Sequence, residues 1–274
     1  MMQRYTWRTG ILEVVMIGVA LIWVIPAYLL VNLAFRARND PAPVLALPTE
    51  IIFDNFVLAW EQGDLGNAFL NTLLVTVISV TLIVVFGVLA SYPLARVSRA
   101  WSGIVFVLFL VGLLLPLQLG LLPLYTSIRD LGLLGSIWGL IIFNVGIQMP
   151  LTIFLYTAFI RVVPREFEEA AAIDGASPFQ ALWRVVFPML RPVTGTVVIL
   201  NAITIWNDFL TPLLYLTGSQ QQTLSVAING FAGQYVSQWH LIFASLVISV
   251  VPILILYFLL QGTVIKGFAG GLKG

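Results

Sequence analysis

The sequence predicts an all-α membrane protein with six transmembrane helices and a polar helix–turn–helix loop on one side of the membrane. Of its 274 residues, 60% are hydrophobic and 9% are charged, whereas soluble domains carry about 25% charged residues. Four long runs contain no Lys, Arg, Asp or Glu, at 14–35, 65–95, 100–128 and 131–160. A helix needs about 20 apolar residues to cross the hydrocarbon core. The apolar stretches therefore predict spans at 12–35, 68–90, 103–124, 137–160, 193–216 and 241–261.

The first apolar stretch follows Arg4 and Arg8 and has some features of a secretory signal. Its apolar region is about 22 residues long, whereas the apolar region of a signal peptide has about 7–15 residues. No small-residue cleavage site follows it. We therefore expect this stretch to stay in the protein as a membrane anchor.

Basic residues are distributed unequally between the two sides of the membrane. With six spans, both termini and the polar loop share one side. Ten Lys and Arg residues fall on that side: Arg4, Arg8, Arg96, Arg99, Arg161, Arg165, Arg184, Arg191, Lys266 and Lys273. Three fall on the other: Arg36, Arg38 and Arg129. Because basic residues concentrate on the cytoplasmic side, the termini and the polar loop are expected in the cytoplasm.

The chain is expected to divide into an N-terminal part, 1–64, and a five-helix core, 65–274. The N-terminal part comprises a short tail, the first span and an external segment. The core carries the polar loop, at 161–191, and a basic C-terminal tail. In the external segment, Asp54 is expected to cap a short helix, which either lies on the membrane surface or packs on the protein.

Composition excludes several kinds of chemistry. The chain has no cysteine, and His240 is its single histidine, so neither a thiolate site nor a histidine metal cluster is expected. Its net charge of +1 gives no electrostatic basis for binding nucleic acid. No catalytic residue, metal site or cofactor is predicted, and the chain is not expected to be an enzyme.

The first half of the polar loop has the signals of a short helix. Pro164 stands where a first helical turn would begin, and Glu166, Glu168 and Glu169 follow it. Acidic side chains in a first turn are favoured by the helix dipole. The alanines that come next continue the helix and leave a face of small side chains, which permits close approach of another protein.

The second half of the polar loop has the signals of a turn and a new helix. Asp174-Gly175 is a stop signal, because glycine readily takes the left-handed conformation that ends helices. Ser177 and Gln180 then have the spacing of a capping box, with Pro178 at the first helical position. These features predict a rigid helix–turn–helix element.

The same loop contains Glu169-Ala170-Ala171, then Gly175, Val185, Phe187 and Pro188. This series resembles the EAA loop of ABC-transporter permease subunits, E-A-A-x3-G-x9-I-x-L-P, with Val185 and Phe187 at the I and L positions. In that family the loop is a cytoplasmic element that docks on the ATPase subunit. The resemblance implies an ATPase-coupling surface made of Glu168, Glu169, Ala170, Ala171, Asp174, Gly175 and Phe179.

Other segments resemble the shorter permease subunit of sugar importers of the maltose-transporter type. They are Pro123-Leu124-Tyr125 with 131–133, Trp206-Asn207-Asp208-Phe209-Leu210, Gly233-Gln234-Tyr235 with Trp239, and the tail 266–274. The resemblance implies a multi-pass subunit in the plasma (inner) membrane of a prokaryote that moves a sugar or related polyol inward. The implied partners are two ATPase subunits, which hydrolyse the ATP, a second permease subunit that is a paralogue, and an external solute-binding protein.

Polar side chains within the spans are candidates for a translocation path. Asp208 is the only acidic residue in a span core, where an unpaired charge is costly. It either lines the path or belongs to a structural hydrogen-bond network. The same two interpretations apply to the amide side chains of the spans, Asn144, Gln148 and Asn207. Because amides and an aromatic face suit an uncharged polyol, the candidates are Asn144, Gln148, Trp206, Asn207 and Asp208.

The last external loop, 217–240, has no formally charged residue and is rich in amides and aromatics. Such side chains suit contact with a sugar-loaded binding protein, although a solvated loop with interfacial aromatics has the same composition. The candidate contacts are Gln220, Gln221, Gln222, Gln234 and Tyr235.

Two alternatives to a sugar importer follow from the sequence. The same machinery could carry glycerol phosphate or another small solute. A phosphate cargo would favour basic residues along the path, whereas the span cores contain no Lys or Arg. A free-standing channel or secondary transporter would need ion sites within the membrane. Asp208 is the only acidic residue in a span core, and one residue is weak evidence for such a site.

Overall fold

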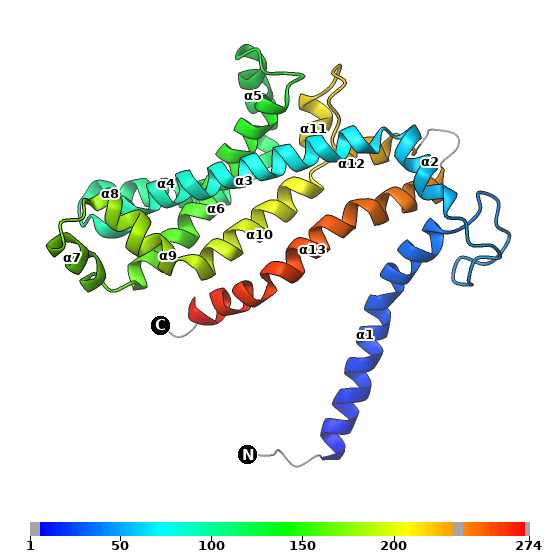
Figure 1. Cartoon of the computed structure of the whole chain (residues 1–274), viewed down its shortest axis with the longest axis horizontal. Coiled ribbons are helices and arrows are strands. Elements are labelled where there is room, and N and C mark those ends of the chain that lie inside the picture. Colours follow the sequence, from blue (N-terminus) through cyan, green and yellow to red (C-terminus); the bar gives the residue numbers. More distant parts are fainter. Residues whose placement is uncertain (1–5, 233–237, 272–274) are drawn as a thin grey trace. The chain divides into compact units, whose positions relative to one another are not determined.

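The structure is a computed structural model that describes residues 6–232 and 238–271 (Figure 1). Every secondary-structure element in these two ranges is a helix, so the all-α fold class predicted from the sequence is confirmed. The chain forms two compact units. The first comprises Met1–Gly66 and Ala227–Val251, and the second comprises Asn67–Val226 and Pro252–Gly274.

The first unit contains α1 (Trp7–Ala34), α2 (Asp54–Gln62) and the start of α13 (Trp239–Gly271). The segment after α1 is held in place by Arg36, which is only 6% exposed. Its guanidinium donates hydrogen bonds to the carbonyl oxygens of Ala42 (2.8 Å) and Pro43 (2.7 Å). The external segment thus has a defined fold. Helix α2 begins at Asp54 with Phe53 as its N-cap, so the expected capping position was wrong by one residue.

The second unit contains the remaining membrane helices and the polar loop. Its long helices are α3 (Leu65–Arg96, from Asn67 on), α4 (Ala100–Leu114), α5 (Leu117–Asp130), α6 (Ile137–Val162) and α10 (Arg191–Asn207). Helix α6 lies at the centre, because α4, α5, α10 and α11 (Leu210–Tyr215) all pack against it. Buried side chains from α3, α6 and α10 form the core of the unit, among them Ile83, Leu140, Tyr156, Val193 and Val197.

Glycines set the distance between neighbouring helices of the second unit. A β-carbon on Gly87 of α3 would lie 2.4 Å from Thr152 Cγ2 of α6. One on Gly112 of α4 would lie 3.2 Å from Pro150 Cγ of α6. Next to the first contact, the Ser91 hydroxyl of α3 donates to the Ile153 carbonyl of α6 at 3.3 Å. Small residues at crossings are typical of helices that associate in a bilayer.

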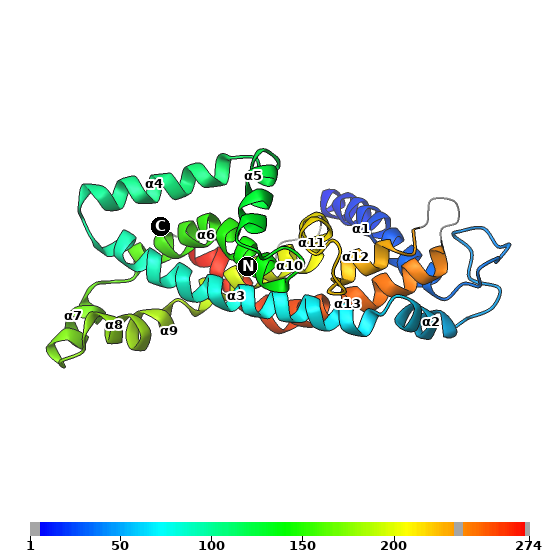
Figure 2. The same ribbon diagram turned by 90° about the horizontal axis from the view of Figure 1, so that it is seen from above.

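The membrane helices differ from the predicted spans in two places. Within the described ranges, four helices are each long and apolar enough to cross a membrane, in α1, α3, α6 and α13. The number rises to six if each of two bent pairs counts as one span. One bent pair is α4 with α5, which meet at 104° (Figure 2). The predicted span 103–124 is therefore sharply bent at Pro116, and it counts as one span only if the two helices of the pair cross the membrane together. The residue before Pro116 is pushed out of the helical conformation, and Leu115 has φ −75° and ψ 125°.

The second difference concerns the expected span 193–216. Helix α10 ends at Asn207, and Asp208 has extended backbone angles, φ −65° and ψ 126°. A separate short helix, α11, follows it. The other bent pair joins Pro178–Met189 to Arg191–Asn207 at 78°. Asp208 thus lies in a break between two helices rather than in the middle of one.

Candidate functional site

The first half of the polar loop is α7 (Glu166–Ile173), which ends in a Schellman motif. Gly175 has φ +82°, the left-handed conformation that the sequence predicted. Its N–H bonds to the Ala172 carbonyl (3.0 Å), and the N–H of Ala176 bonds to the Ala171 carbonyl (2.9 Å). Both bonds satisfy carbonyl groups that the end of α7 would otherwise leave free. The chain therefore turns sharply and with a fixed geometry after α7.

The second half begins with the predicted capping box. The Ser177 hydroxyl accepts from the Gln180 N–H (3.3 Å), and Gln180 Oε1 accepts from the Ser177 N–H (2.8 Å). Pro178 occupies the first turn of α8 (Pro178–Ala181). The turn at Gly175 and this cap together fix the angle between α7 and α8.

A π-helical turn follows α8, at Leu182–Val186, and leads into α9 (Phe187–Met189). No sequence signal was recognised for it. Three aromatic rings lie along this stretch: Phe179 contacts Trp183 edge-on at 6.2 Å between centroids, and Trp183 contacts Phe187 at 5.0 Å. The aromatic series keeps the irregular turn packed.

The polar loop exposes most of its predicted coupling residues. Five of them are exposed and Ala171 is half-buried; the exposed ones are Glu169, Ala170, Asp174, Gly175 and Phe179. Phe179 is 62% exposed, and Ile173 beside the turn is 86% exposed. Ile173 was not among the predicted site residues, although a large apolar side chain in a polar loop could have indicated it. The exposed set surrounds the Gly175 turn and offers both charge and apolar surface.

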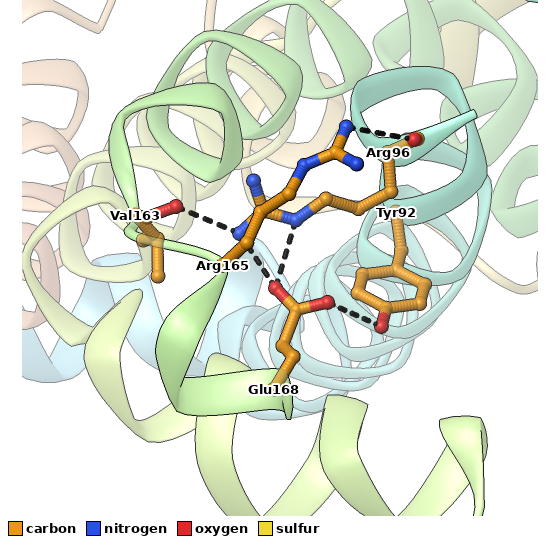
Figure 3. A network of polar contacts seen from close by, with 5 residues as sticks. All are labelled: Tyr92, Arg96, Val163, Arg165 and Glu168. Atoms are coloured by element: carbon orange, nitrogen blue, oxygen red, sulfur yellow. Dashed lines mark hydrogen bonds and ion pairs between the residues drawn. The ribbon is translucent and has the colours of Figure 1, made fainter. Parts of the chain in front are cut away.

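Glu168 differs from the exposed coupling candidates because its side chain contacts α3 (Figure 3). Its carboxylate accepts a hydrogen bond from the Tyr92 hydroxyl at 2.7 Å and forms an ion pair with Arg96 at 2.6 Å. The side chains of Arg96 and Glu168 are 11% and 15% exposed. Tyr92 and Arg96 belong to the last turn and a half of α3, so Glu168 faces the helix bundle of this chain. Sequence reasoning identified Glu168 but not its partners.

The five path candidates do not share one environment. Asn144 is buried in α6, Gln148 is half-buried one turn later, and Trp206 is buried in α10 against Phe69, with ring centroids 5.7 Å apart. Asn207 is exposed and donates to the Ile203 carbonyl of its own helix at 2.9 Å.

Asp208 and Asn201 make different polar contacts, one at the helix break and one between α10 and α6. Asp208 Oδ1 accepts from the Thr211 N–H at 3.3 Å, which places it at the start of α11. In α10, Asn201 donates to the Val197 carbonyl at 2.7 Å and to Thr152 Oγ1 of α6 at 3.4 Å. Asn201 was not among the predicted path candidates.

An apolar groove of about 550 Å³ runs along the second unit and contains one of the path candidates, Trp206. Its walls come from α3, α10 and the part of α13 from Pro252 on. Thr76 and Thr81 provide its hydroxyl groups. The groove is therefore mainly a surface for apolar groups.

The external-loop candidates separate into three kinds. Gln220 is exposed. Gln221 Oε1 accepts from the Ile137 N–H at the start of α6 (3.1 Å), and the Gln222 carbonyl accepts from Asn71 (3.0 Å). The remaining two candidates, Gln234 and Tyr235, lie outside the described residues.

The chain is similar to known transport proteins over most of its length. Residues 83–269 match the family described as binding-protein-dependent transport system inner membrane component. The melibiose/raffinose/stachyose import permease protein MelC of Bacillus subtilis (strain 168) is 38% identical over 248 residues, which cover 90% of each chain. The probable starch degradation products transport system permease protein AmyC of Thermoanaerobacterium thermosulfurigenes is 34% identical over 256 residues, 93% of each chain.

Solved structures support the same fold. A chain in the crystal structure of a bacterial ABC transporter involved in the import of the acidic polysaccharide alginate superposes with a TM-score of 0.80, at 23% identity. The superposition covers 95% of this chain and 99% of that chain. The family match covers more than half of the sequence, and the relatives match nearly all of it. This chain therefore belongs to the family of binding-protein-dependent transport system inner membrane components, as a transport permease subunit.

Proposed function

We propose that this chain is a permease subunit of an ATP-binding-cassette importer that moves a sugar or related polyol inward across the membrane. The observation that carries the proposal is the fixed, exposed turn around Gly175, in a chain whose relatives include import permeases for melibiose, raffinose and starch products. Such a turn is a rigid projection from a membrane bundle, and it suits contact with a separate protein.

The exposed part of the polar loop is the proposed docking surface for an ATPase subunit. Glu169 offers a negative charge in the first turn of α7, and Ala170 and Ala171 allow close approach. Ile173 and Phe179 provide exposed apolar side chains on both sides of the turn. ATP hydrolysis is assigned to that partner. The loop and both termini would then lie in the cytoplasm, which the excess of basic residues on that side supports.

The opposite side of the membrane is proposed to meet the solute-binding protein. Gln220 is exposed there, while Gln221 and Gln222 anchor the same loop to α6 and α3. The anchoring would hold Gln220 in a defined position. A second permease subunit completes the path, to which Asn144, Gln148 and the α10–α11 break would contribute.

The experiment is reconstitution of the chain in proteoliposomes with the proposed partners: an ATPase, a second permease subunit and a solute-binding protein. Uptake of labelled raffinose and melibiose is measured with and without ATP and with and without binding protein. Uptake that needs both supports the proposal. Uptake without ATP would indicate a free-standing channel or secondary transporter. ATP hydrolysis that responds to glycerol phosphate and to no neutral sugar would overturn the cargo assignment.

A further inference from the structure

Three helix ends meet at Glu168 (Figure 3). Arg96 is the last residue of α3, Val163 is the C-cap of α6, and Glu168 is in the first turn of α7. Arg96 bonds to both other elements at once: its Nε donates to Glu168 Oε1 at 2.8 Å, and its Nη2 donates to the Val163 carbonyl at 2.9 Å. One guanidinium therefore ties α7 to α3 and to α6.

Two further contacts strengthen this junction. The Tyr92 hydroxyl donates to the second oxygen of Glu168 at 2.7 Å, so both carboxylate oxygens are engaged. Arg165 Nη2 donates to the Arg96 carbonyl at 3.0 Å, and the carbonyl groups at the end of a helix need such an external donor. We call the set Tyr92, Arg96, Val163, Arg165 and Glu168 the clamp.

The charges of the clamp agree with the helix dipoles. Glu168 is near the N-terminus of α7, where a negative charge is favoured, and Arg96 is at the C-terminus of α3, where a positive charge is favoured. Both side chains are largely buried, so solvent screens their attraction less than on an open surface. Removal of either partner leaves a mostly buried charge without its counter-ion, which is unfavourable.

Apart from the clamp, α7 is connected to the bundle through its chain neighbours and through its packing on α8 and the π-helical turn. Three residues, Val163 to Arg165, separate α6 from α7, and such a linker can act as a pivot. On the other side, the π-helical turn and the bend at Leu190 separate α8 from α10. Neither of these connections ties α7 directly to the end of α3, as the clamp does.

We propose that Glu168 and Arg96 are positioning residues that make α7 and the end of α3 move as one body. The inference rests on the proposed function of the polar loop as an ATPase-docking element. Glu168 then contributes no direct contact with the ATPase. Its role is to transmit a displacement of the docking surface into α3, whose length crosses the second unit from Asn67 to this junction.

The functional test compares Glu168→Gln with Glu166→Gln in the reconstituted complex. Glu166 is the matched control, because it lies in the same turn of α7 and is exposed. We expect Glu168→Gln to retain the ATPase subunits on purification but to lower raffinose uptake per ATP hydrolysed roughly tenfold. Tyr92→Phe, which removes one hydrogen bond, should have a smaller effect. The charge exchange of Arg96→Glu with Glu168→Arg should restore part of the loss, and Glu166→Gln should resemble the wild type.

A distance measurement tests the clamp independently of transport. The chain has no cysteine, so spin labels can be placed at Ser98→Cys, just after α3, and Glu166→Cys on α7. We expect one narrow distance distribution with and without ATP, and a broad one when Glu168→Gln is added. This measurement remains valid in the detergent-purified chain even if no ATPase binds and the proposed function fails.

Two results would overturn the inference. Wild-type uptake per ATP together with a narrow distance distribution in Glu168→Gln would show that the clamp does not position α7. Loss of the ATPase subunits from Glu168→Gln, with the label distances unchanged, would place Glu168 in the docking surface itself.

Discussion

Gly87 of α3 lies directly against the side chain of Thr152 of α6. A β-carbon on Gly87 would lie 2.4 Å from Thr152 Cγ2 and 3.4 Å from the Tyr156 ring. Thr152 has little freedom to move away, because its side chain is β-branched and stiff at χ1. Its hydroxyl also accepts from Asn201 of α10. The contact therefore fixes three helices of the second unit relative to one another.

Gly87→Ala is expected to destabilise this helix packing by about 1–3 kcal/mol, the usual cost of inserting a methyl group into a packed core. Thermal unfolding of the detergent-purified chain would measure it. Gly146→Ala in α6 is the control, because a β-carbon there meets nothing within 4 Å. Thr152→Ser removes the clashing methyl group and should restore most of the lost stability in the double variant. If the stability changes of Gly87→Ala and Thr152→Ser simply added in the double variant, the contact between the two residues would not be the cause of the destabilisation.

Gly175→Val is expected to reduce transport by tilting α8 against α7. The position has open space around it, so the cost is the backbone strain of the left-handed conformation, about 1–2 kcal/mol for a residue with a side chain. Uptake should fall while the unfolding temperature of the membrane bundle stays the same. Gly175→Asn should retain more activity, because asparagine tolerates this conformation.

Gly132→Val provides the control for that substitution. Gly132 also has a left-handed φ of +69° with nothing near its β-carbon position, but it lies between α5 and α6, away from the polar loop. A loss of uptake equal to that of Gly175→Val would mean that strain alone, rather than the loop geometry, lowers activity.

Glu169→Lys is expected to release the ATPase subunit. The change reverses the charge on the proposed docking surface and also loses about 0.3–1 kcal/mol of favourable interaction with the α7 dipole. Glu166→Lys loses the same dipole interaction. On affinity purification, Glu169→Lys should therefore retain less of the ATPase than Glu166→Lys does. Equal retention would remove Glu169 from the docking surface and leave only its apolar part, around Phe179.

Asp208→Asn and Asp208→Ala separate the two interpretations of this carboxylate. The contact with the Thr211 N–H needs only an oxygen acceptor, which asparagine retains and alanine lacks. A structural role predicts near-normal assembly for Asp208→Asn and a loss of about 0.5–1.5 kcal/mol for Asp208→Ala. A role in the path predicts a changed apparent affinity for raffinose in Asp208→Asn with normal assembly. Uptake kinetics and thermal unfolding of both variants decide between them.

Local features of the polar loop were predictable from the sequence. The capping box of Ser177 and Gln180 and the left-handed Gly175 depend on residues at most a few positions apart, and both are present as expected. The long apolar helices were predictable for a similar reason, since hydropathy is a property of the segment itself.

The helix breaks and the clamp could not be predicted in the same way. Hydropathy treats 103–124 as one continuous stretch, although Pro116 interrupts it, and the 104° bend depends on how α4 and α5 pack on α6. Glu168 and Arg96 are 72 positions apart in the sequence. Nothing in the first turn of α7 distinguishes an acidic residue that faces α3 from one that faces outward. Only the packing of the helix ends separates Glu168 from Glu169.

The π-helical turn at Leu182–Val186 makes the facing direction of the loop sensitive to chain length. A π turn contains one residue more than the α-helix into which it is inserted. Because successive residues of an α-helix are about 100° apart around the axis, deletion of one residue here would rotate α8 by about that angle relative to α9. Phe179 and the Gly175 turn would then face another way, with every side chain of the surface still present. The number of residues between Gly175 and Pro188 therefore determines the direction in which the loop faces its partner.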